Sequence, residues 1–136
     1  MANYYESART NYFRVKDEAA FRAFIDTIGG ADLVTDDKDN KLFAVLFTED
    51  GVPSSRYNEE TEDYDDFDFM TELAPFLADA SIAILMASGA EKLRYVSGYA
   101  EAIDNTGKSV RVSINDIYKL VKQEFGEKAE VTPAEY

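Results

Sequence analysis

The spacing of apolar residues along the chain predicts one clear helix near its start. Between Ala20 and Ile28, apolar residues recur at intervals of three and four, which is the spacing of one helix face. Asp17 precedes them and is expected to cap the first turn, because a short side chain with an oxygen can accept from the free backbone N–H groups there. Gly29 and Gly30 are expected to end this helix.

Short runs of β-branched and aromatic residues predict the strands. The expected strands are residues 10–15, 32–36, 41–48, 52–57, 81–87, 93–103 and 109–114. Segment 42–47 is apolar throughout, which is typical of a central strand covered on both faces. Pro53 restricts the fourth strand to an edge or an irregular segment. Ser88 and Gly89 are expected to end the fifth strand, and the polar group 104–107 predicts a hairpin turn.

Two later segments also carry apolar residues at helical spacing. The apolar positions are Phe69, Leu73, Phe76 and Leu77 in the first segment and Ile117, Leu120, Val121 and Phe125 in the second. We expect the first to form a short helix that begins near Asp68 or Thr71 and tolerates Pro75 early, because a proline inside a helix costs about 3 kcal/mol unless it lies in the first turn. Asn115 and Gly126 are expected to bound the second helix.

These elements predict an α+β fold in which an antiparallel sheet carries about three helices packed on it. A chain of 136 residues is the usual size of a single domain, and we expect that domain to cover residues 1–126. Residues 1–9 are expected to fray, and residues 127–136, which include Pro133, are expected to form a flexible tail. Residues 57–69 fall between two halves that each combine a helix with strands, so we expect them to form a crossover on the domain.

The composition excludes several kinds of site. The chain has no Cys and no His, which excludes disulfides, Cys-His sites and Ser-His-Asp triads and removes the usual general base and imidazole metal ligand. No apolar stretch approaches the roughly 18 residues of a membrane span, and the first residues lack the basic start of a leader peptide. We therefore expect a soluble cytoplasmic protein that is not an enzyme and uses no cofactor or metal.

Most of the negative charge lies in one stretch. Seven of the ten residues 59–68 are acids: Glu59, Glu60, Glu62, Asp63, Asp65, Asp66 and Asp68. Residues 49–79 hold eleven acids and the single base Arg56, a balance of -10 within the chain's -13. Such a field repels nucleic acid and membrane headgroups and attracts basic surfaces. A basic protein is therefore the favoured partner, and direct contact with nucleic acid or a membrane is not expected.

Other motifs are incomplete. Residues 105–109 (NTGKS) end like a phosphate loop, but Ala102 stands where that motif needs its first glycine. The acids at 36–39 resemble part of a calcium loop, yet Leu42 stands where the turn glycine would be. Residues 59–68 also lack such a glycine. Their acids are consecutive and solvated, whereas a glycosidase holds two carboxylates a fixed distance apart in a cleft.

The spacing of the acids limits what the stretch can imitate alone. Extended at about 3.3 Å per residue, seven charges in ten residues give one charge per ~5 Å. A single nucleic-acid strand carries one per ~3.4 Å and a DNA duplex one per ~1.7 Å of its axis. To imitate a duplex, the stretch would need the acids at 36–39, 49–50, 72 or 79 beside it.

The short, strongly acidic chain, with its acids gathered in EETEDYDDFD, resembles the anti-CRISPR and antirestriction proteins. These are small inhibitors encoded by phages and conjugative elements, and several of them mimic DNA. The segments NYYESARTNYFRVKD and AEKLRYVSGYA also resemble a family carried by mobile elements. The resemblance is one of type over the whole chain; it implies an inhibitor acting in a bacterial host cell and assigns no role to an individual residue.

The leading hypothesis is a non-catalytic inhibitor that binds a basic nucleic-acid-handling protein, such as a CRISPR effector or a restriction enzyme, and blocks nucleic-acid binding. The seven acids of residues 59–68 would carry the electrostatics, with Tyr57 and Tyr64 as candidate contact aromatics. One alternative is a structural or regulatory interaction module whose acidic loop only keeps it soluble. Another is a carboxylate or metal-dependent enzyme.

Overall fold

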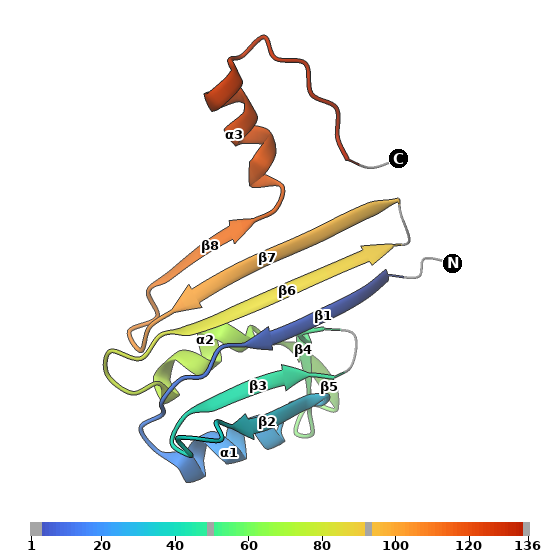
Figure 1. Cartoon of the computed structure of the whole chain (residues 1–136). Helices are drawn as coiled ribbons and strands as arrows, with labels where there is room; N and C mark the ends of the chain where they lie inside the picture. Colours follow the sequence, from blue (N-terminus) through green and yellow to red (C-terminus); the bar gives the residue numbers. More distant parts are fainter. Residues whose placement is uncertain (1–3, 49–50, 92–93, 135–136) are drawn as a thin grey trace.

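The computed structural model of the chain describes residues 4–48, 51–91 and 94–134 and confirms the α+β fold. The strands are β1 (Tyr4–Thr10), β2 (Ala31–Thr35), β3 (Phe43–Phe47), β4 (Ser55–Asn58), β5 (Asp63–Asp66), β6 (Ala83–Glu91), β7 (Tyr95–Ile103) and β8 (Ser109–Ser113). The helices are α1 (Glu18–Asp26), α2 (Phe69–Leu73), the short 3-10 helix η1 (Ala74–Phe76) and α3 (Asp116–Phe125). Six strands form one antiparallel sheet in the order β2-β3-β1-β6-β7-β8, while β4 pairs with β5 in a separate hairpin (Figure 1).

α1 forms where the apolar spacing predicted a helix. Asp17 lies at the N-cap, and its Oδ1 accepts from the backbone N–H of Ala20 at 3.1 Å. Phe21 and Ile25 are buried on the face turned to the sheet. The helix ends at Thr27, before the two glycines expected to stop it, because the N–H and the hydroxyl of Thr27 already bond the carbonyls of the last turn.

The prediction of a strand at residues 10–15 is wrong. The strand lies earlier, in the segment expected to fray, and β1 pairs over its full length with β6, from Tyr4↔Glu91 to Thr10↔Leu85. Within residues 11–15, Phe13 forms an isolated bridge to Phe43 of β3, and Val15 forms one to Leu77, which lies after η1 and outside the sheet. The middle of β1 has no β-branched residue, so its strand conformation depends on neighbours that are distant in sequence.

β6 also differs from its expected length. It continues past Ser88 and Gly89, the expected stop, as far as Glu91. Ser88 is paired on both edges, with Ser7 of β1 and Gly98 of β7. Pairing on two sides holds the backbone extended, and this outweighs the local preference of serine and glycine for a turn.

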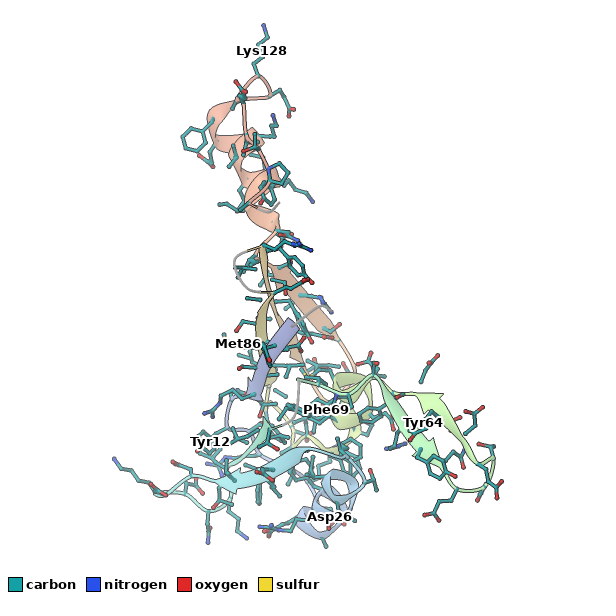
Figure 2. The ribbon with its side chains drawn as sticks, turned by 90° about the vertical axis from the view of Figure 1, so that its right-hand side faces the viewer. Tyr12, Asp26, Tyr64, Phe69, Met86 and Lys128 are labelled. Atoms are coloured by element: carbon teal, nitrogen blue, oxygen red, sulfur yellow. The ribbon has the colours of Figure 1, made fainter. Side chains whose placement is uncertain are left out.

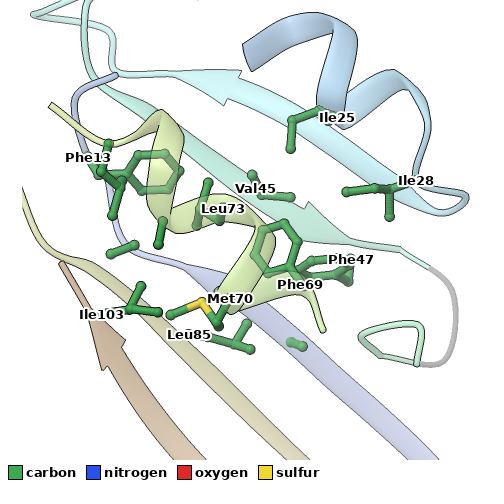
Figure 3. Close-up of a cluster of buried hydrophobic side chains, with 14 of the residues drawn as sticks. Phe13, Ile25, Ile28, Val45, Phe47, Phe69, Met70, Leu73, Leu85 and Ile103 are labelled. Atoms are coloured by element: carbon green, nitrogen blue, oxygen red, sulfur yellow. The ribbon is translucent and has the colours of Figure 1, made fainter. Parts of the chain in front are cut away.

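The core lies between one face of the sheet and the helices α1 and α2 (Figure 3). Phe21 is fully buried there, and its ring makes edge contacts with Phe13 and Phe43 at centroid distances of 5.7 and 5.8 Å. Pro75 lies at the start of η1, directly after α2. α2 begins at Phe69, close to the expected start, but the proline expected early in that helix follows it instead, because a proline inside the helix would remove a backbone hydrogen bond.

Among the residues that the structure describes, no helix lies on the opposite face of the sheet (Figures 1 and 2). α3 has the predicted bounds and ends at Gly126, but none of its residues is buried, so it does not pack on the sheet with the other two helices. The tail turns back along it: Lys122 Nζ donates to the Ala129 carbonyl at 2.8 Å, and the Ala134 N–H donates to the Tyr118 hydroxyl at 2.7 Å. In the described part of the chain, no helix combines the length and the apolar character that crossing a membrane requires.

Candidate functional site: the acidic hairpin

The acidic stretch folds as the β4–β5 hairpin, which projects from the body of the protein (Figure 2). The two strands pair in register over all four of their residues, which leaves residues 59–62 as the turn. Asn58 shapes this turn, because its Oδ1 accepts from the backbone N–H of Glu60 at 2.9 Å. Glu62 completes the turn with a positive φ of 55°.

A pair of tyrosines spans the middle of the hairpin. Tyr57 in β4 lies opposite Tyr64 in β5, and their rings meet edge to face with centroids 5.2 Å apart. Such a cross-strand aromatic pair contributes roughly 0.5–1 kcal/mol to a hairpin. Both residues nevertheless stay exposed, at 51% and 66%. The two candidate contact aromatics therefore stabilise the hairpin and remain accessible to a partner.

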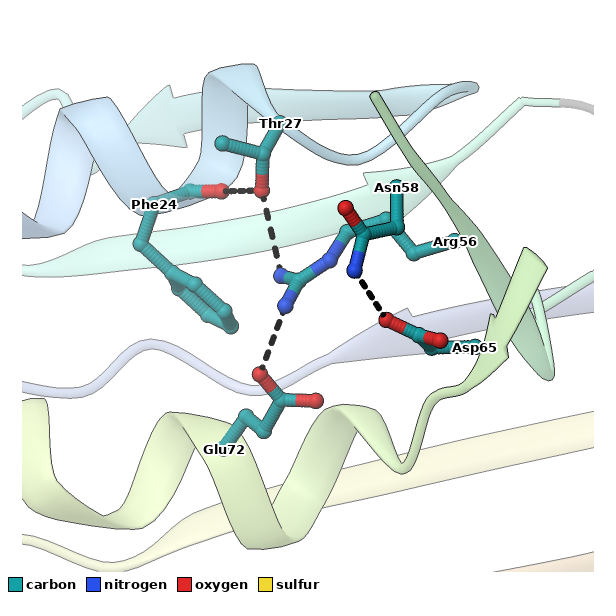
Figure 4. A network of polar contacts seen from close by, with 6 residues as sticks. All are labelled: Phe24, Thr27, Arg56, Asn58, Asp65 and Glu72. Atoms are coloured by element: carbon teal, nitrogen blue, oxygen red, sulfur yellow. Dashed lines mark hydrogen bonds and ion pairs between the residues drawn. The ribbon is translucent and has the colours of Figure 1, made fainter. Parts of the chain in front are cut away.

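The opposite side of the hairpin is attached to the body through Arg56 (Figure 4). Its Nη2 lies 3.1 Å from Oε1 of Glu72 in α2, and its Nη1 donates to the Thr27 hydroxyl at 3.4 Å. Its guanidinium also lies 4.9 Å from the centre of the buried Phe67 ring. The single base of the acidic region is thus directed toward the body, where it pairs with the α2 carboxylate.

All seven acids predicted as site residues are exposed. Six of them belong to the hairpin and its turn: Glu59, Glu60, Glu62, Asp63, Asp65 and Asp66. Asp65 accepts from the side chain of Asn58 at 2.9 Å. Asp68 lies outside the hairpin at the N-cap of α2, where its Oδ2 accepts from the Thr71 hydroxyl at 2.9 Å. The structure therefore brings six of the predicted acids together and gives the seventh a place at a helix end.

Folding into a hairpin raises the density of the charges. Four paired residues span about 13 Å, and with the turn the six carboxylates occupy roughly 17 Å, or one per ~3 Å. A single nucleic-acid strand carries one charge per ~3.4 Å, and a duplex carries about twice that density. The hairpin thus matches the charge spacing of one strand, which the extended chain does not.

Of the other acids that could extend the hairpin, Glu72 lies beside it and pairs with Arg56, whereas residues 36–39 and Asp79 lie elsewhere. The β2–β3 turn with residues 36–39 lies at the opposite end of the sheet (Figures 1 and 2). There Asp39 bonds Arg14 at 2.6 Å, and this hydrogen bond is the main cause that holds the pKa of Asp39 below its ordinary value. Asp79 accepts from Asn105 at 2.8 Å beside the β7–β8 turn. Residues 49 and 50 lie outside the described residues.

A cleft of about 860 Å3 lies between the hairpin, α1 and α2. Phe24 and Phe76 line it from the body, and their rings stack with centroids 4.8 Å apart. Arg56, Tyr57 and Glu59 line it from the hairpin, and Arg56 pairs there with Glu72, so Glu59 is the acid that stays available to a partner. A cleft with aromatic walls and an acidic edge suits a cationic side chain, because a guanidinium can stack on a ring while pairing with a carboxylate.

The sequence reasoning missed the anchor and the cleft. In the sequence Arg56 is the single base among the acids, and a lone base in such a stretch is a signal for an internal ion pair. Phe24 and Phe76 fit the apolar faces of their helices, and nothing in their spacing separates a cleft wall from a core position. Only the folded chain places them opposite Tyr57.

The remaining motifs of the sequence have structural roles. Residues 105–108 belong to the hairpin connection between β7 and β8 and Ser109 begins β8, so this segment is not a phosphate loop between a strand and a helix. Asp104 holds this turn: its Oδ1 accepts from the Thr106 hydroxyl at 2.6 Å and from the Lys108 N–H at 3.0 Å. The Thr106 contact is the main cause that lowers the pKa of Asp104. Within the described ranges, no group of three acids is placed to hold a metal ion.

Comparison of the chain with protein-family models, with curated proteins and with solved structures gives no match. The candidate site therefore rests on its own geometry. That geometry is an exposed hairpin with six carboxylates, joined to the body by Arg56 and flanked by an aromatic cleft.

Proposed function

We propose that the protein is a non-catalytic inhibitor that acts in the cytoplasm of a bacterial host cell. It binds a basic nucleic-acid-handling protein and blocks that protein's nucleic-acid site. A CRISPR effector or a restriction enzyme is the proposed class of partner. The proposed contact is the β4–β5 hairpin.

The observation that carries this proposal is the gathering of six exposed carboxylates on one projecting, anchored hairpin. Charges of one sign on a protruding element produce a field that steers a basic partner toward it. Because Arg56 fixes the hairpin to α2, less conformational freedom is lost when a partner binds. A loop that served only solubility would need neither the anchor nor the tyrosine pair.

The tyrosines and the cleft support a protein partner. Interfaces owe much of their affinity to a few aromatic and arginine side chains. Tyr57 and Tyr64 are exposed beside the carboxylates, and the neighbouring cleft suits an arginine of the partner. A basic groove that normally contacts phosphates offers such arginines.

The charge spacing favours one kind of groove. About one carboxylate per ~3 Å corresponds to a single nucleic-acid strand and not to a duplex. The proposed target is therefore a groove that holds single-stranded RNA or DNA. A single-stranded oligonucleotide should displace the protein from its partner more effectively than a duplex of the same sequence.

The test is a pull-down from bacterial lysate with the immobilised protein at low and high salt, followed by identification of the bound proteins. The expected result is a basic nucleic-acid enzyme that is retained at low salt and released as salt rises, because salt screens the attraction between exposed charges, with a screening length of about 10 Å at 0.1 M. Retention of no such enzyme at low salt would contradict the proposal.

A pair of variants then tests the hairpin itself against the partner found. Glu60→Lys with Asp63→Lys should weaken binding more than ten-fold. The control, Asp36→Lys with Asp37→Lys, changes the net charge equally at the far end of the sheet and should weaken binding much less. Equal losses of affinity in the two variants would show that binding depends on net charge alone. Full binding by the hairpin variant would leave the acidic loop with a solubilising role only.

A further inference from the structure

The uncovered face of β6, β7 and β8 is apolar. The register aligns Met86, Ala100 and Val112 in one row across the three strands and Ile84, Ala102 and Val110 in the next. These two rows, with Ile82 and Val96, are called the outer face below. The alternate residues of β6, such as Leu85, point into the core instead. Because the rows hold no charged side chain, this face has the composition of an interior and lacks a cover.

α3 exposes an apolar stripe that lacks a surface to pack on. Its apolar stripe consists of Ile117, Leu120, Val121 and Phe125, and none of these residues is buried. Phe125 is 77% exposed and Ile117 is 55% exposed. A ten-residue helix is marginal in water without a surface to pack on. The stripe therefore needs an apolar partner surface.

The chain prevents α3 from covering its own outer face. The Ile114 N–H donates to the Gly98 carbonyl at 3.0 Å, which holds the end of β8 against β7. The Ser113 N–H donates to Asp116 Oδ2 at 2.9 Å, and the helix begins at once. With so short a connection, α3 continues away from the sheet and does not turn back over it (Figures 1 and 2).

The exposed apolar area is large enough for a stable pair of molecules. The side chains that are between 44% and 77% exposed here are Ile82, Met86, Val96, Val110, Val112, Ile117, Leu120 and Phe125. At roughly 100 Å2 each, they present about 800 Å2 of apolar surface per copy. A standard interface buries about 800 Å2 on each partner, whereas the largest patch of an ordinary monomer is roughly 300–600 Å2.

The charge of this region is also compatible with a second copy. Residues 81–91 and 94–134, which hold the outer face and α3, carry seven acids and six bases, a balance of -1, although the chain carries -13. The acidic hairpin lies on the other side of the sheet: Figure 2 shows Met86 and Tyr64 on opposite sides of the ribbon. Two copies that meet through their outer faces keep their hairpins apart, so repulsion between the hairpins is weak.

We propose that the protein forms a homodimer in which α3 of each copy packs its stripe on the outer face of the other copy. Each copy exposes both the apolar stripe of α3 and the apolar outer face. In a twofold dimer, α3 of each copy covers the outer face of the other, so both apolar surfaces are buried. This inference goes beyond the proposed function and does not depend on it. It leaves both β4–β5 hairpins exposed.

The first experiment measures the mass of the full chain in solution by sedimentation or light scattering across a range of concentrations. The expected result is twice the monomer mass at micromolar concentration, and stronger association at high salt because an apolar contact is retained while repulsion is screened. A monomer at every concentration up to about 1 mM would overturn the proposal, as would a pair that dissociates at high salt.

Two variants of equal exposure locate the contact. Val110 and Tyr64 are each 66% exposed, so neither substitution by Asp removes a core contact. Val110→Asp should weaken dimerisation at least ten-fold, and Tyr64→Asp should leave it unchanged. Circular dichroism checks that both variants are folded. A dimer that tolerates Val110→Asp and loses association with Tyr64→Asp would overturn the assignment of the surface.

Cross-linking tests the arrangement, because the chain has no cysteine of its own. The variant with both Val112→Cys and Leu120→Cys should form a disulfide-linked dimer on mild oxidation, with position 112 of one copy joined to position 120 of the other. Each single variant should cross-link far less. Efficient cross-linking of Leu120→Cys alone would show helix against helix, and of Val112→Cys alone sheet against sheet; either result would overturn the exchange of helices.

Discussion

The guanidinium of Arg56 lies 3.1 Å from the carboxylate of Glu72 and joins the acidic hairpin to α2. Both side chains are more than one third exposed, at 37% and 36%, so the ion pair itself contributes only about 0–1 kcal/mol. The main effect of Arg56 is to fix the position of the hairpin on the body, since the same arginine also bonds Thr27 and lies over the Phe67 ring.

Arg56→Met should therefore loosen the hairpin more than it destabilises the protein. We expect a loss of about 1 kcal/mol in the free energy of unfolding and faster amide exchange confined to residues 55–66. Hydrogen exchange measured by mass spectrometry checks this pattern. Arg22→Met, which breaks the exposed pair with Glu18 on α1, is the control and should leave exchange in the hairpin unchanged.

A side chain at Gly51 should require the Glu6 side chain to move. Its φ is +86°, where an L-residue costs about 1–2 kcal/mol, and an added Cβ would overlap the Glu6 side chain. Gly107 has a similar φ of +90° with nothing near its missing Cβ. Gly51→Ala should thus destabilise the protein more than Gly107→Ala in denaturant unfolding. Adding Glu6→Ala should remove the difference, and a difference that persists would exclude Glu6 as its cause.

Thr10 should be sensitive to loss of its hydroxyl. The residue is 1% exposed; its Oγ1 accepts from the Val45 N–H at 2.9 Å and donates to the Asn11 carbonyl at 2.8 Å. Thr10→Val keeps the shape but leaves a buried N–H without its acceptor, which costs about 1–3 kcal/mol. Thr10→Ser keeps the acceptor and should cost less. Equal losses in thermal unfolding would mean that packing, and not the hydrogen bond, sets the stability.

The stability should fall at alkaline pH through Tyr99. Burial first, and the Glu6 carboxylate second, raise the pKa of Tyr99 above its ordinary 10.0, against the opposing effect of Arg111 4.0 Å from its ring. The folded state thus favours the protonated phenol. This stabilisation is complete below pH 10.0 and is lost as pH rises through the folded-state pKa. Tyr99→Phe should flatten the decline in unfolding free energy above pH 10.0, as denaturant unfolding at a series of pH values can measure.

The sequence predicts the helices and hairpins that form because of residues close to one another in the chain. α1 follows from its apolar spacing and Asp17, and the β7–β8 hairpin follows from the turn held by Asp104. β1 was missed because Glu6, Ser7 and Ala8 favour no strand by themselves, and pairing with β6, more than seventy residues away, holds them extended.

The candidate site is likewise only partly predictable from the sequence. Its acids and tyrosines are visible in the sequence as a cluster, but the register that puts Tyr57 opposite Tyr64 is a property of the folded hairpin. The bonds of Arg56 to Glu72 and Thr27 join three separate segments, which spacing along the chain does not reveal. The bounds of α3 were predictable, whereas its lack of any cover was not.

The uneven distribution of charge gives the molecule an electric dipole moment. Residues 51–91 hold ten acids and one base, while residues 94–134 are balanced. Near a basic surface, within a Debye length of about 8 Å at physiological salt, the molecule experiences a torque that turns its β4–β5 end forward. Orientation thus begins before any contact forms. In a twofold pair the components perpendicular to the axis cancel, so a dimer would approach a target with less torque than two separate copies.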